Sequence, residues 1–156
     1  MTVIGIDPGL EGAIATISPA GVVIAPMPVE FDEIDARALC NYLSRKMPAL
    51  VVVEKLHGMP GFGASNFKFG GSYYAAIYCC QILGLPMERV TPQRWKKAIL
   101  EGTNKDKKAA IKWARNAYPS VNLKPPNKST LSHDYAEALA LAEYGCRMKG
   151  VNRGEA

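Results

Sequence analysis

The sequence predicts an α/β domain built on a mixed sheet flanked by helices. Short apolar runs at 2–7, 13–17 and 22–25 are separated by tight turns at Pro8-Gly9 and at 19–21, a pattern typical of an antiparallel three-strand meander. Helical and strand-like segments alternate after the meander, which favours parallel strands added to the same sheet. We therefore expect a five-stranded mixed sheet, antiparallel at one side and parallel at the other.

The later elements follow from hydrophobic spacing and breaker residues. Apolar residues recur at helical spacing over 33–47 and Pro48 ends the run, while Leu50–Val53 is entirely apolar, typical of a strand covered on both faces. A glycine-rich loop over 55–71 is longer than most connections, which indicates a function for it. The remaining predicted elements are a helix over 72–83, a strand over 87–90, and helices over 92–100, 105–117 and 133–148, the last with Ser132 as its N-cap.

The chain of 156 residues predicts one domain over 1–150 and a short polar tail over 151–156. No apolar run approaches the roughly 20 residues that cross a bilayer, and no basic-then-apolar leader opens the sequence. The four cysteines form no C-x-x-C pair and only two histidines occur, so we expect no structural zinc site and reduced thiols. A cytoplasmic location without membrane contact is the expectation.

Basic residues are concentrated in one quarter of the sequence. Residues 91–128 contain ten Lys and Arg against two acids, a local charge of +8, whereas the whole chain carries +5. A segment of this charge favours a polyanionic partner, because neutralised phosphates release their counterions. A merely solvated basic face is the alternative.

Four acids stand in apolar surroundings. Asp7 ends the first strand, Glu54 ends the strand "LVVVE", and Asp134 and Glu137 lie three apart on one face of the last helix. Taken singly each has a structural explanation; Asp134, for example, is favoured by the dipole of the helix it begins. Together, the ends of neighbouring strands and a helix could bring all four to one point.

Converging carboxylates cannot all stay ionised without a cation. Oxygen ligands without His or Cys suit Mg²⁺ or Mn²⁺. Two such ions about 4 Å apart would activate a water and stabilise the leaving oxygen of a phosphodiester. The acids therefore predict a two-ion magnesium site in which manganese can substitute.

Four stretches carry a resemblance to a known family. "GIDPGLEGAIA", "VVVEKLHGMPG", "TPQRWKKAILEGTNKDKKAA" and "HDYAEALALA" occur in the order found in the RuvC family of Holliday junction resolvases, within the ribonuclease H-like superfamily. "FKFGGSYYAAI" resembles phage-type members. The resemblance implies a ribonuclease H-like fold, and a bacterial or phage-infected cytosol, or else an organelle, as the location.

Several site residues are implied by the resemblance. Asp7, Glu54, Asp134 and Glu137 would be the catalytic, metal-binding carboxylates, and Asp7 would bridge both ions. Glu137 departs from the Asp, or in some members His, that the family has there. His133 is adjacent to the acids as an alternative ligand or a helix-start residue.

The resemblance and helical spacing each single out basic residues in this segment. Lys107 in "NKDKKAA" matches a lysine used near the scissile phosphate, and Lys97 is the second candidate for that role. Helical spacing places four further side chains on one face suited to the DNA backbone: Lys105, Lys108, Lys112 and Arg115.

The glycine-rich loop corresponds to the family's junction wedge. Met59, Phe62 and Phe67 are the candidates; Phe62 lies between two glycines and could stack on unpaired bases, or fold back on the core. The apolar helix 72–83 is either core or a two-fold dimer interface, which two symmetric cuts would need.

The predicted function is metal-dependent, structure-selective cleavage of four-way junctions by a homodimer. Three alternatives remain. A less selective RuvC-like nuclease would cut flaps, forks or branched phage DNA. "GIDPGLEG" also fits the phosphate loop of actin-like ATPases and sugar kinases, although those proteins need two domains and a second glycine-rich motif. A non-enzymatic DNA-binding protein would leave the four acids unexplained.

Overall fold

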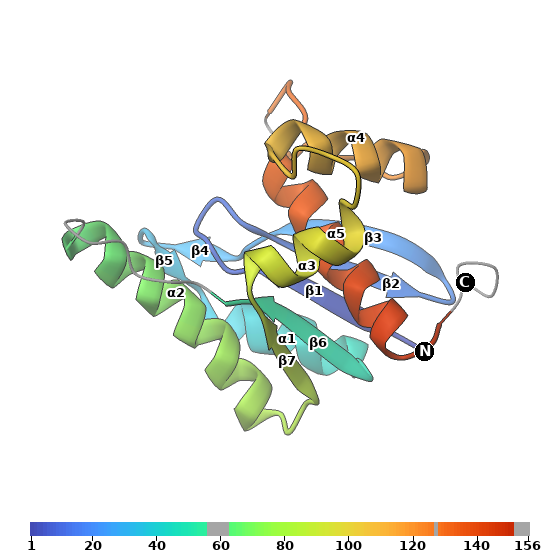
Figure 1. The fold of residues 1–156 in the computed structure, drawn as a ribbon. Helices are drawn as coiled ribbons and strands as arrows, with labels where there is room; N and C mark the ends of the chain where they lie inside the picture. Colours follow the sequence, from blue (N-terminus) through green and yellow to red (C-terminus); the bar gives the residue numbers. More distant parts are fainter. Residues whose placement is uncertain (56–62, 127, 152–156) are drawn as a thin grey trace.

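A five-stranded mixed sheet organises the chain (Figure 1). The computed structural model describes residues 1–55, 63–126 and 128–151, with the side chains of 64–66 also left out. The strand order is β3-β2-β1-β6-β7. The bounds are β1 Val3–Asp7, β2 Ala13–Ser18, β3 Gly21–Pro26, β6 Leu50–Glu54 and β7 Met87–Val90. β2 runs antiparallel to β1 and β3, while β6 is parallel to β1 and β7, which confirms the predicted sheet.

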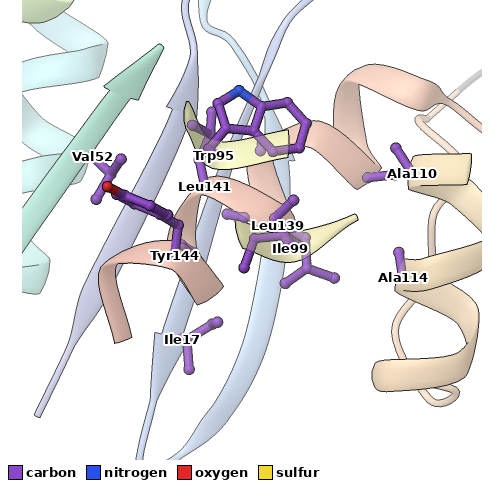
Figure 2. Packing of buried hydrophobic residues seen from close by; sticks show 14 of the residues in the cluster. Ile17, Val52, Trp95, Ile99, Ala110, Ala114, Leu139, Leu141 and Tyr144 are labelled. Atoms are coloured by element: carbon purple, nitrogen blue, oxygen red, sulfur yellow. The ribbon is translucent and has the colours of Figure 1, made fainter. Parts of the chain in front are cut away.

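Helices cover both faces of this sheet. One face carries α1 (Ala36–Lys46) and α2 (Gly63–Ile82), and the other carries α3 (Pro92–Ile99), α5 (His133–Met148) and, packed on α5, α4 (Lys107–Ala117). Figure 2 shows the core on the α5 side, where Trp95, Leu139 and Leu141 belong to one buried cluster. No helix in the described residues is long and apolar enough to cross a membrane.

Side chains alternate between the two cores along β1 and β6. Val3 of β1 and Val52 of β6 belong to the cluster beneath α5, whereas Ile4 and Val53 belong to the cluster beneath α1 and α2. By this alternation, the odd positions of β1 and the even positions of β6 face α5. Asp7, the last residue of β1, therefore faces the same helix as Glu54, the last residue of β6.

Glycine lets α5 rest directly on the central strand. A Cβ atom on Gly5 would lie 2.2 Å from the Ala138 carbonyl oxygen and 2.3 Å from the Ala142 nitrogen, so no other residue fits there. Gly145 of α5 makes the reciprocal approach, because its Cβ would lie 2.7 Å from side-chain atoms of Val3 and Val52. This close packing fixes the beginning of α5 over the carboxyl ends of β1 and β6.

Side-chain caps define where three helices begin. Asp35 accepts a hydrogen bond from the Ala38 amide at 2.9 Å, and Asp106 accepts one from the Ala109 amide at 2.7 Å. The Ser132 hydroxyl accepts from the Tyr135 amide at 3.4 Å, which confirms Ser132 as the cap of α5. A capped start at Ser132 places the next residues, including Asp134, in the first turn.

The structure corrects the predicted extent of two helices. α2 begins at Gly63, so the loop predicted over 55–71 is wrong from 63 onward; a glycine costs a helix only about 1 kcal/mol and does not by itself end it. α4 begins at Lys107, because Asp106 is its N-cap and Lys105 has a left-handed φ of 57°. Lys105 therefore does not share a helix face with the other lysines.

A two-stranded hairpin precedes α1 where a helix was expected from residue 33. β4 (Val29–Glu30) pairs with β5 (Glu33–Ile34), and the turn residues Phe31 and Asp32 have φ of 51° and 62°. Asp32 forms an ion pair with Lys68 of α2, which anchors the hairpin to that helix. The expected helix therefore starts later, at Ala36.

Candidate active site

A cavity of about 430 Å³ opens where the carboxyl ends of β1 and β6 meet the beginning of α5. Its lining includes all four acids predicted to act together: Asp7, Glu54, Asp134 and Glu137. Lys107, the first residue of α4, lines the same cavity, as do His133 and Phe69. Four elements far apart in the sequence thus bring the predicted carboxylates and one predicted lysine to one place.

Asp7 is the most strongly perturbed of these acids. Its side chain is almost fully buried, and this desolvation raises its pKa well above the usual range. The charges of Glu54, Asp134 and Glu137 raise it further, and a hydrogen bond from the Gly9 backbone opposes them. The four carboxylates are therefore close enough to repel one another, with Asp7 at their centre.

Glu54 is held by a tryptophan from α3. The Trp95 indole Nε1 donates a hydrogen bond to Glu54 Oε1 at 2.7 Å, and both side chains are buried. Burial raises the pKa of Glu54, and the Trp95 hydrogen bond is the largest opposing influence. Glu137 raises this pKa further and Lys96 lowers it. Trp95 is thus a core residue whose N–H also orients a carboxylate.

Glu137 is paired with a lysine that sequence reasoning missed. Lys96 Nζ lies 3.0 Å from Glu137 Oε1 and 5.1 Å from the centre of the Trp95 ring. Lys97, the predicted second candidate, is exposed on the same helix. Nothing in "PQRWKK" separates Lys96 from Lys97, because the rotation of α3 about its axis decides which of the two lysines faces Glu137.

Asp134 is oriented by its neighbours at the start of α5. Ser132 Oγ donates to Asp134 Oδ2 at 3.1 Å, and His133 Nε2 lies 3.1 Å from Asp134 Oδ1. The first turn of a helix also favours a carboxylate through the helix dipole. His133 is thus both a helix-start residue and part of the cavity wall.

The predicted DNA-contact residues fall in three places. Lys108, Lys112 and Arg115 are exposed on α4, outside the cavity, and Lys105 is exposed just before that helix. Phe67 is exposed on α2. Met59 and Phe62 lie outside the described residues.

The donor set fits a divalent cation, although the acids do not surround one point as they stand. Within residues 1–55, 63–126 and 128–151, no three His, Cys, Asp or Glu side chains are arranged to hold one ion. Glu54, Glu137 and Asp134 each turn toward a partner of their own, respectively Trp95, Lys96 and Ser132 with His133. Four mutually repelling carboxylates in one cavity are nevertheless the oxygen donors that Mg²⁺ prefers, and a cation would relieve the repulsion on Asp7.

Comparison with known proteins identifies the fold. No protein-family model and no curated protein matches the sequence. Among solved structures, Thermus thermophilus RuvC bound to a Holliday junction matches with a TM-score of 0.65 and 19% identity over 97% of both chains. The fowlpox virus Holliday junction resolvase matches with a TM-score of 0.54 and 16% identity, over 95% of this chain and 99% of that one. The yeast mitochondrial resolvase Ydc2 matches with a TM-score of 0.53 and 14% identity, over 96% of this chain and 79% of that one. The chain therefore shares the fold of RuvC, as the sequence resemblance predicts.

Proposed function

We propose that this protein is a metal-dependent, structure-selective DNA endonuclease that resolves four-way junctions as a homodimer. The observation that carries the proposal is the single cavity that collects Asp7, Glu54, Asp134 and Glu137, with Lys107 at its edge. The fold shared with resolvases supports the choice of substrate, since one of the matched structures is described as RuvC in complex with a Holliday junction.

The four carboxylates would hold two Mg²⁺ ions, with Mn²⁺ able to substitute. When bound, these ions supply an activated water and charge neutralisation at the phosphodiester. The chain's own contribution is position: the sheet fixes Asp7 and Glu54, and the capped start of α5 fixes Asp134 and Glu137 opposite them. Hydrolysis would leave 5′-phosphate and 3′-hydroxyl ends.

Lysines would bind and orient the phosphate groups. Lys107 would bind a non-bridging oxygen of the scissile phosphate, and its position in the lining of the cavity that holds the acids supports this role. Lys96 keeps Glu137 paired in the free protein and so reduces the repulsion among the acids. Lys108, Lys112 and Arg115 on α4 would bind the DNA backbone outside the cavity, with Lys97 and Lys105 as additional contacts.

The aromatic residues would act on the junction itself and on the partner subunit. An exposed stripe on α2 contains Tyr74, Tyr78 and Ile82, which suits a two-fold interface between two copies. Phe62, with Met59 and Phe67 as alternatives, would insert at the junction centre, where unpaired bases can stack on an aromatic ring.

Cleavage of a DNA panel tests the proposal. A four-way junction, a three-way junction, a 5′-flap and a linear duplex of equal length are incubated with the protein, with Mg²⁺ or with EDTA. We expect paired, symmetric cuts in the four-way junction that require Mg²⁺. Equal cutting of the flap and the junction would favour the less selective nuclease, whereas equal cutting of the duplex would contradict the proposal.

A further inference from the structure

The contact between Trp95 and Glu54 joins the hydrophobic core to the cavity. Trp95 is fully buried in the cluster of α3, α4 and α5, where its ring packs among apolar side chains such as Leu141 (Figure 2). Packing alone would be served equally by an aromatic ring without a polar atom. Its indole N–H, however, leaves the apolar cluster and reaches Glu54 at 2.7 Å.

This hydrogen bond selects one oxygen of the carboxylate. The indole nitrogen can only donate a hydrogen bond, so Oε1 must be the accepting oxygen. Trp95 is held rigidly by its packing, and Glu54 is the last residue of a central strand, so both ends of the contact are fixed by the fold. The bond leaves Oε2 as the oxygen of Glu54 that can face the cavity.

The same helix turn contacts a second acid. Lys96, the next residue, lies over the Trp95 ring and pairs with Glu137. Two consecutive residues of α3 therefore orient two carboxylates that come from β6 and from α5. Such outer contacts typically matter as much as the ligands they hold, and their loss costs about 10–100-fold in metal affinity or activity.

We infer that Trp95 is a positioning residue, which fixes Glu54 with Oε1 bound to the indole and Oε2 turned toward the cation. This inference rests on the proposed function, since it concerns the same cavity. It assigns to the tryptophan a role that its burial in the core does not by itself require.

The test removes the N–H while keeping the ring. Trp95→β-(3-benzothienyl)alanine replaces the indole N–H by sulfur and preserves the bicyclic shape, and Trp95→Phe is a second, genetically simple variant. Trp113→Phe is the matched control, because Trp113 of α4 packs against Tyr118, the C-cap of that helix, and does not line the cavity within the described residues. Thermal unfolding is measured for each variant.

Two readouts separate positioning from packing. Mn²⁺ binding to the DNA-free protein, followed by the EPR signal of free Mn²⁺, should weaken about ten-fold in the benzothienyl variant. The single-turnover cleavage rate at saturating Mg²⁺ should fall to a similar extent, while the junction Kd in EDTA is unchanged. Trp113→Phe should match the wild type in both.

The outcomes for Trp95 and for the proposed function are distinguishable. If the benzothienyl variant binds Mn²⁺ as tightly as the wild type, the positioning role is overturned. It is also overturned if the wild-type protein binds no Mn²⁺. If the wild type binds Mn²⁺ but cuts no branched DNA, the proposed function fails and the Mn²⁺ comparison still decides the role of Trp95.

Discussion

α5 and α2 are both rich in apolar residues, but the fold uses them differently. From Tyr135 to Cys146 every residue of α5 is buried, and its backbone contacts β1 through Gly5. α2 buries Tyr73, Ile77 and Cys80, yet leaves Tyr74, Tyr78 and Ile82 exposed. The difference shows that the rest of the fold buries α5, which carries two of the acids. α2, by contrast, has an apolar face that the described residues leave exposed.

Two glycine substitutions, one in the strand beneath α5 and one within α2, should change stability in opposite directions. Gly5→Ala places a Cβ inside the backbone of α5, so we expect a loss of about 3 kcal/mol or more, or about 6 °C and upward in Tm. Gly70→Ala on α2 meets no atom within 4 Å, and alanine favours the helix, so Tm should rise by roughly 1–3 °C. Calorimetry measures both; a harmless Gly5→Ala would refute the close contact of α5 with β1.

The exposed stripe of α2 should control association and leave the fold of the monomer intact. Tyr78 stacks on Tyr74 at 5.7 Å and is more than half exposed. Tyr78→Ser should convert a dimer of twice 16.9 kDa into a monomer by light scattering, with far-UV circular dichroism unchanged. Val23→Ser, at an exposed position on β3, is the control and should remain dimeric. A wild type that is monomeric at all concentrations would contradict the interface.

Burial of Asp7, together with repulsion from the neighbouring acids, should make stability depend on pH. The pKa of Asp7 is raised in the folded state, so the folded protein retains a proton over a range in which the unfolded chain has lost it. Stability should therefore fall as pH rises from the usual aspartate pKa through the raised value, in the absence of divalent ions. Asp7→Asn should flatten this dependence and stabilise the protein at pH 8 by on the order of 1 kcal/mol. Added Mg²⁺ should stabilise the wild type more than Asp7→Asn.

The smallest effect is expected from single lysines on α4. Lys112→Gln removes one contact with the DNA backbone, so junction affinity should fall a few-fold. The steepness of log K against log salt should decrease by about 1. Lys149 is exposed just beyond the C-terminal end of α5, whereas the acids lie at the beginning of that helix. Lys149→Gln should therefore change neither the junction affinity nor the salt slope. An unchanged salt slope for Lys112→Gln would exclude α4 from the DNA interface.

The sheet and the four acids could be predicted because their signals are local. The strings "VIGID" and "LVVVE" can each be recognised as an apolar strand that ends in an acid. The alternation of side chains along a strand then determines on which face of the sheet each acid lies. The acids of α5 follow in the same way from helical spacing after a capping serine. The structure places all four on one cavity.

Other features depend on contacts between distant residues. Trp95 reads from the sequence as core, and only the placement of α3 beside β6 brings its N–H to Glu54. The choice between Lys96 and Lys97 depends on the rotation of α3, which "WKK" alone does not specify. The early start of α2 is not predicted because its glycines resemble helix breakers, although each costs a helix only about 1 kcal/mol.

The most direct test of the central claim is to separate binding from cleavage at Asp7. Asp7→Asn preserves the size of the side chain and removes the charge at the centre of the four acids. We expect this variant to bind a four-way junction with an affinity equal to or above that of the wild type. Its Mg²⁺-dependent cleavage rate should fall at least about 1000-fold, or about 4 kcal/mol in activation free energy. Cleavage at the wild-type rate by Asp7→Asn would contradict the assignment of the active site.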